Sequence, residues 1–106
     1  MILKTEVTVM LEFELIIEKD ARKFFDKHED VLQRYKDSLR EYLTGKHPER
    51  IDIKILEGKQ NKYYRMKLGK WRIIFIITGD TVRIIDTLLA GSRGDIYKKI
   101  GGIKIL

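Results

Sequence analysis

The sequence predicts an α+β domain: an N-terminal strand, a helical hairpin and an antiparallel β-meander sheet covered on one face by the helices. Two observations support this. One alternating apolar segment precedes two stretches with helical periodicity, and four further strand segments follow them. The chain has 106 residues, of which 43% are hydrophobic, so it can bury one core. We therefore expect a single domain over residues 1–106.

The first strand is predicted within residues 10–17, where apolar side chains recur at every second position. The members of this apolar face are Leu11, Phe13, Leu15 and Ile17. If Met10 marks the start of the domain, residues 1–9 form an N-terminal extension. Alternatively, Val7 and Val9 continue the strand toward the N-terminus.

Two helices follow this strand. Asp20 is predicted to be the N-cap of a short first helix, and a longer second helix reaches Gly45, the expected C-cap, before Pro48 prevents continuation. The helical spacing in the first comes from Ala21, Phe24, Phe25 and His28. In the second it comes from Val31, Leu32, Tyr35, Leu39, Tyr42 and Leu43. Together they form the helical hairpin.

The strands after the hairpin carry cations among their apolar residues. A strand over 51–55 leads through the loop 59–62 into a strand over 64–68. In that second strand Arg65 and Lys67 alternate with apolar side chains, which places both cations on the opposite, solvent-facing side. On that side they have two interpretations: ordinary exposed strand residues, or ligands for an anion.

Two glycine turns complete the predicted meander. Gly69 and Lys70 form a hairpin turn before a central strand over 71–77, whose single charge is Arg72. The pair Gly79-Asp80 forms the next turn, and the third strand runs from Val82 to Leu89, with Gly91 ending it. The alternative role for Arg72 is an ion pair with Asp86 or Asp95, since buried charges are usually paired.

Positive charge is concentrated in the second half of the chain. Residues 1–61 carry 12 basic and 13 acidic side chains, whereas residues 62–106 carry 10 basic and only 3 acidic ones. A one-sided field of this kind attracts polyanions. We expect Arg65, Lys67, Arg72 and Arg93, with Tyr97, to converge at one edge of the sheet, on the face that the helices leave uncovered. The order of the strands cannot be assigned from the sequence.

Several other functions are not favoured. The chain has no cysteine, which excludes disulfides and thiolate chemistry, and His28 and His47 alone make a weak case for a metal, so none is expected. The sequence suggests neither a signal peptide nor a membrane span, so we expect a cytoplasmic protein without a small-molecule cofactor. Gly101 and Gly102 are expected to form a flexible break before a tail over 103–106.

Three blocks of the sequence carry a family resemblance. They are Leu56-Glu57-Gly58; Tyr63 to Gly69 with Trp71 to Phe75; and Gly91-Ser92-Arg93-Gly94-Asp95-Ile96-Tyr97. From about Leu11 to Tyr97 the chain resembles the RelE/ParE toxin superfamily, in particular its RelE branch. The most specific part is the arginine followed shortly by a tyrosine after a glycine-ended strand.

The resemblance implies a toxin of a toxin–antitoxin pair: an mRNA interferase that is bound to the ribosome, cuts mRNA and is silenced by a cognate antitoxin peptide. Cleavage would proceed by attack of a ribose 2′-hydroxyl and needs no metal. In this hypothesis Arg93 and Arg72 hold the scissile phosphate, Arg65 and Lys67 bind phosphate nearby, and Tyr97 stacks on or protonates the substrate. Simple C-terminal packing is the alternative for Tyr97.

Departures from the family pattern leave alternatives open. Arginine cannot lose its proton, so of Arg65 and Lys67 only Lys67 could act as a general base, and the identity of the base is undetermined. Ser92 and Gly94 stand where relatives often have basic residues or histidine. Two other functions therefore remain: a ParE-like poison of DNA gyrase, and a nucleic-acid-binding module without catalysis, such as a degenerate toxin.

Overall fold

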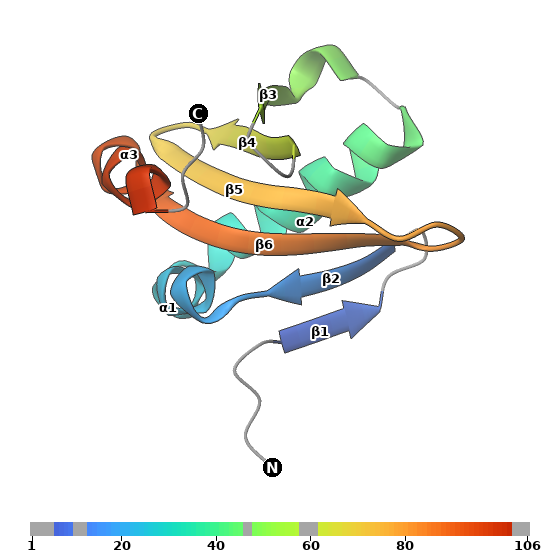
Figure 1. Ribbon diagram of the computed structural model, residues 1–106, viewed down its shortest axis with the longest axis horizontal. Coiled ribbons are helices and arrows are strands. Elements are labelled where there is room, and N and C mark those ends of the chain that lie inside the picture. The colour runs from blue at the N-terminus through green and yellow to red at the C-terminus, as the bar shows by residue number, and fades with distance from the viewer. Residues whose placement is uncertain (1–5, 10–12, 46–47, 58–61, 103–106) are drawn as a thin grey trace.

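The computed structural model describes residues 6–9, 13–45, 48–57 and 62–102. In this part of the chain a six-stranded sheet has helices on both of its faces (Figure 1). The helices are α1 (Lys19–Lys27), α2 (Glu29–Thr44), the 3-10 helix η1 (Pro48–Arg50) and α3 (Arg93–Gly102). The strands are β1 (Glu6–Val9), β2 (Phe13–Ile17), β3 (Asp52–Glu57), β4 (Lys62–Leu68), β5 (Trp71–Thr78) and β6 (Arg83–Ser92). The predicted α+β class is confirmed.

The sheet is mixed, with strand order β1-β2-β6-β5-β4-β3. Strands β2 and β6 pair in parallel, and the other neighbouring strands pair antiparallel. The meander of β4, β5 and β6 is confirmed, as are both glycine turns: Gly69 and Gly79 have φ angles of 60° and 91°. A side chain at Gly79 would also collide with the carbonyl oxygen of Val82, so this turn requires glycine.

The hairpin of α1 and α2 covers one face of the sheet and encloses the main core. Tyr35 and Phe25 stack there with ring centroids 5.7 Å apart, and the Tyr35 hydroxyl lies 2.7 Å from the Thr87 hydroxyl in a buried hydrogen bond. Helix α2 ends at Gly45, whose φ of 75° confirms the predicted C-cap. The fully buried side chains of this core include Phe13, Leu15, Ile17, Leu39, Met66, Ile73, Phe75 and Ile85.

Helix α3 lies on the opposite face, at the end of the sheet where β5 begins and β6 ends (Figure 1). Its Ile96 is fully buried against Ile74 and Leu89. The expectation that this face stays uncovered was therefore wrong for the area beneath α3. The cause is a helix that sequence reasoning missed.

Two expectations around α3 need correction. Gly91 does not end the strand, because β6 continues to Ser92. Gly101 and Gly102 are the last residues of α3 and not a flexible break. The Ser92 hydroxyl accepts a hydrogen bond from the backbone N–H of Asp95 at 3.3 Å and so caps the helix. The signal available in the sequence was the serine followed three residues later by an acidic residue.

The N-terminal region also differs from expectation. Glu6–Val9 does not continue the first strand, because it is a separate strand that pairs antiparallel with β2. Residues 10–12 lie outside the described residues, as do 1–5 and 103–106. Asp20 is not the N-cap, because α1 begins at Lys19 after Glu18, which makes no side-chain capping hydrogen bond. No helix among the described residues is long and apolar enough to cross a membrane.

Candidate functional site

Antiparallel register builds two rows of side chains on the face away from α1 and α2. Directly paired residues in an antiparallel sheet point to the same side. The first row is Asp52, Lys67, Arg72 and Gly91, and the second is Lys54, Arg65, Ile74 and Leu89. The cations of β4 and β5 are therefore neighbours on one face, as the alternation in the sequence predicted.

Arg72 is buried, and no described residue gives it a carboxylate partner. Only 9% of the residue is exposed. Its Nη1 donates hydrogen bonds to the carbonyl oxygens of Gly69 and Trp71, at 2.9 and 3.0 Å, and its buried Nε has no acceptor. The alternative of an ion pair with Asp86 or Asp95 is not observed among the described residues. A buried cation that lacks a counter-ion is costly, so this guanidinium is suited to receive an anion from outside the protein.

Arg65 has one acidic partner in the described part of the chain. Its Nη2 donates a hydrogen bond of 2.7 Å to Oδ1 of Asp52, and its buried Nε has no acceptor. The Arg65 side chain is 16% exposed, whereas the Asp52 side chain is 55% exposed. The pair therefore joins a largely buried cation to a carboxylate that is open to solvent.

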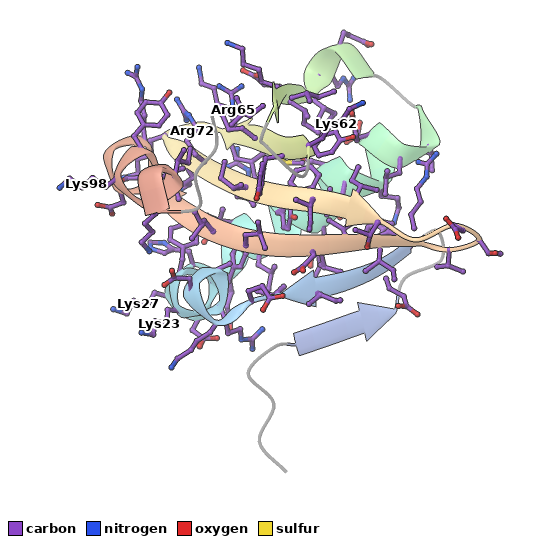
Figure 2. The ribbon with its side chains drawn as sticks, viewed as in Figure 1. Lys23, Lys27, Lys62, Arg65, Arg72 and Lys98 are labelled. Atoms are coloured by element: carbon purple, nitrogen blue, oxygen red, sulfur yellow. The ribbon has the colours of Figure 1, made fainter. Side chains whose placement is uncertain are left out.

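Arg93 and Tyr97 bring α3 into the same site. They lie one helical turn apart, with the Arg93 guanidinium 5.3 Å from the centroid of the Tyr97 ring. Hydrogen bonding and charge from Arg93 lower the pKa of the exposed Tyr97 phenol, and the charges of Arg65 and Arg72 lower it further. Figure 2 shows Arg65 and Arg72 close together at the end of the sheet beside α3. Arginines from β4, β5 and α3 thus act electrostatically on one phenol, and Arg93 of α3 contacts its ring.

Lys67 joins this group through its position in the sheet. It is exposed on β4, directly between Asp52 of β3 and Arg72 of β5 in register. The structure therefore brings all five predicted residues to one end of one sheet face. Simple C-terminal packing does not describe Tyr97, which is 51% exposed. Lowering the pKa of a phenol makes it a better proton donor near neutral pH.

A depression on the other side of α3 from Arg93 and Tyr97 was not anticipated. A cavity of about 290 Å³ lies between α1 and α3, lined by Lys23, Lys27, His28 and Trp71 among others. Lys23 and Lys27 extend from α1 in Figure 2. Lys99 of α3 lies 3.6 Å from Asp20 of α1, which pairs charges across this cavity. Its existence depends on α3, so the sequence signal is again the cap at Ser92.

The two histidines offer no evidence for a metal centre. His28 stacks on the Phe24 ring with centroids 4.3 Å apart and contacts Trp71, as expected of a packing residue. His47 lies outside the described residues. Within the described residues, no group of three or more histidine, aspartate or glutamate side chains is placed to bind a metal ion.

Comparison of the chain with protein-family models, curated proteins and solved structures finds no match. The functional assignment is therefore based on the geometry of the site.

Proposed function

We propose that this protein is a RelE-like toxin: a ribosome-dependent endoribonuclease that cuts mRNA by attack of a ribose 2′-hydroxyl and so inhibits translation. The observation that carries this proposal is the gathering of Arg65, Lys67 and Arg72 on one sheet face, at the end where α3 places Arg93 against the Tyr97 ring. The resemblance in sequence to the RelE branch supports the same assignment.

The reaction requires charge stabilisation above all. Attack of the 2′-hydroxyl on the adjacent phosphorus forms a phosphorane whose oxygens carry more negative charge than the starting diester. Fixed donors aimed at that charge stabilise the transition state in a site from which water is excluded. In our proposal Arg72 and Arg93 bind these oxygens, and Arg65 and Lys67 hold phosphate nearby. Planar guanidinium groups match phosphate oxygens in pairs of hydrogen bonds.

Proton transfer is assigned to the two groups of the site that can exchange a proton. Tyr97, with its lowered pKa, protonates the leaving 5′-oxygen. Lys67 is the one cation of the four that can lose its proton, and it is our candidate base. This pair is weak for acid–base catalysis, so we expect the ribosome to supply much of the positioning of the substrate.

The test is a cleavage assay with purified protein, radiolabelled mRNA and programmed ribosomes. Arg93→Ala should lower the cleavage rate on the order of 10²-fold, by analogy with the loss of one oxyanion donor. Arg34→Ala is the matched control, because Arg34 is exposed on α2, on the opposite face of the sheet. Omitting the ribosomes should leave little cleavage of free RNA.

Other outcomes would identify the alternative functions. Parental cleavage by Arg93→Ala would remove the assignment of this arginine. Inhibition of gyrase supercoiling without RNA cleavage would favour the ParE-like function. RNA binding without either activity would indicate a non-catalytic module.

The proposal includes a partner and a location. A toxin of this type acts in the cytoplasm, and we expect a cognate antitoxin peptide encoded beside it. A short acidic chain that folds on binding suits the basic second half of this protein. Sequencing the adjacent DNA tests this expectation.

A further inference from the structure

One of the proposed phosphate-binding residues, Arg65, already has an anionic partner within the protein. Asp52 comes from β3, and its carboxylate accepts a hydrogen bond of 2.7 Å from Arg65 on β4. Its direct partner in the sheet is Lys67, so Asp52 stands beside both cations that β4 contributes to the site. A diagonal cross-strand contact of this kind is within reach of a long arginine side chain.

We infer that Asp52 is an internal competitor for the RNA phosphate, which must displace it to bind Arg65. This inference rests on the proposed function and names a residue that controls access to its site. A carboxylate oxygen and a phosphate oxygen use the same guanidinium donors. While the Asp52 carboxylate accepts from Nη2 of Arg65, the pair is nearly neutral. Phosphate binding then replaces Asp52 by phosphate as the partner of Arg65.

The exposure of the two side chains makes this exchange feasible. The Asp52 side chain is 55% exposed, so its carboxylate can return to water at small cost. The Arg65 side chain is only 16% exposed, so its guanidinium cannot recover its solvation in the same way. The buried Arg65 Nε also lacks an acceptor. An incoming phosphate can therefore accept a hydrogen bond from Nε of Arg65.

Arg72 provides a comparison for Arg65, because no competing carboxylate lies beside it among the described residues. In the adjacent position of the sheet Arg72 has backbone carbonyls as partners and no carboxylate among the described residues. Of these two arginines on one face, Arg65 has a carboxylate partner and Arg72 has backbone carbonyls instead. Asp52 weakens the affinity of the site for a lone phosphodiester, which favours RNA that is also held by other contacts, as on the ribosome.

The experiment measures binding without cleavage. The probe is a fluorescein-labelled single-stranded RNA with 2′-O-methyl riboses, which has phosphates but no attacking hydroxyl. Fluorescence anisotropy at low salt gives Kd for the wild type and Asp52→Asn. Asparagine keeps the shape of the side chain and removes its charge. We expect Asp52→Asn to bind on the order of five-fold tighter, the size of one exposed ion pair.

The chain offers a matched control. Asp37 is also 55% exposed and also pairs with an arginine, Arg40, but it lies on α2 behind the sheet. Asp37→Asn makes the same change in net charge, and we expect a gain in affinity below about two-fold because salt screens distant charges. A thermal melt of each variant confirms that it is folded.

A double-mutant cycle tests whether the gain passes through Arg65. Arg65→Met keeps much of the apolar stem and removes the guanidinium, and in this background Asp52→Asn should bring no gain beyond that of Asp37→Asn. Equal gains from Asp52→Asn and Asp37→Asn would overturn the inference, as would a gain that persists without Arg65. So would the absence of RNA binding by both the wild type and Asp52→Asn.

The inference and the proposed function can fail separately. If the cycle gives the expected coupling but ribosome-bound mRNA is not cut, the nuclease assignment fails and the competition stands. If mRNA is cut and the cycle shows no coupling, Asp52 has no part in access to the site.

Discussion

The two faces of the sheet differ in whether their buried polar groups are hydrogen-bonded. Thr87 and Asp86 are adjacent in β6 and therefore point to opposite faces. Thr87 faces the helical hairpin, where its hydroxyl is fully buried and bonded to Tyr35. Asp86 faces the other side, where its buried Oδ1 has no hydrogen-bond partner. The same face holds the unpartnered Nε atoms of Arg65 and Arg72.

This difference separates a scaffold from a site. Native proteins rarely leave buried polar atoms unpaired, and the exceptions concentrate where function requires them. The hairpin face follows the packing rules closely and supplies the stability of the domain. Among the described residues, the α3 face leaves three buried polar atoms unpaired, two of which belong to the candidate phosphate site.

Arg72→Met should separate activity from stability and is expected to have the largest effect. Methionine has a similar length and removes a buried, unpaired charge, so the free energy of unfolding should stay equal or rise. Cleavage of ribosome-bound mRNA should fall on the order of 10²-fold, because a donor to the phosphorane is lost. Urea unfolding and the cleavage assay measure the two quantities. Retained cleavage with lost stability would instead make Arg72 part of the scaffold.

Tyr35→Phe tests the face covered by the helical hairpin. In contrast to Arg72→Met, it should lower stability and leave cleavage unchanged. It leaves the buried Thr87 hydroxyl without a partner and should lower the free energy of unfolding by about 1–2 kcal/mol. Cleavage measured well below the melting temperature should be unchanged. Tyr42→Phe is the control, because Tyr42 is only partly buried on the same helix. Equal losses from both variants would show that the buried hydrogen bond contributes nothing.

The sequence predicted those parts of the fold that depend on local signals. Gly69 and Gly79 indicated both turns, and the structure gives both glycines a positive φ. Apolar periodicity indicated the helical hairpin and the meander, and these residues form the core. The parallel pairing of β2 with β6 has no local signal, because it joins segments about 70 residues apart, and the sheet order follows from it. Helix α3 was missed because it buries few apolar side chains and carries three glycines, which disfavour helix.

The part of the candidate site that depends on local sequence signals was also predictable. Alternation in β4 placed Arg65 and Lys67 on one face, and the sequence block from Gly91 to Tyr97 marked Arg93 and Tyr97. The Asp52–Arg65 contact was not predictable, since it depends on the register between β3 and β4. A change of one residue in that register would turn Asp52 to the other face.

Asp86→Asn examines the remaining unpaired atom on the α3 face and should have the smallest effect. Burial, together with hydrogen bonding and charge from Glu18, raises the pKa of Asp86 from the ordinary 3.8 to about 7. A carboxyl whose pKa is higher in the folded state resists ionisation there. Its ionisation therefore destabilises the fold, and this cost grows as the pH rises from about 4 to about 7.

Asparagine cannot ionise, so the variant should escape this cost. At pH 8 we expect Asp86→Asn to exceed the wild type in free energy of unfolding by on the order of 1 kcal/mol, a value reduced for solvent screening of a partly exposed group. At pH 4.5 the difference should be much smaller, because this pH lies only just above the pKa of 3.8 at which the carboxyl of the unfolded chain ionises. Urea unfolding at both pH values, with Asp37→Asn as the control for net charge, measures it. A difference independent of pH would show that burial and Glu18 do not raise the pKa of Asp86 in the folded protein.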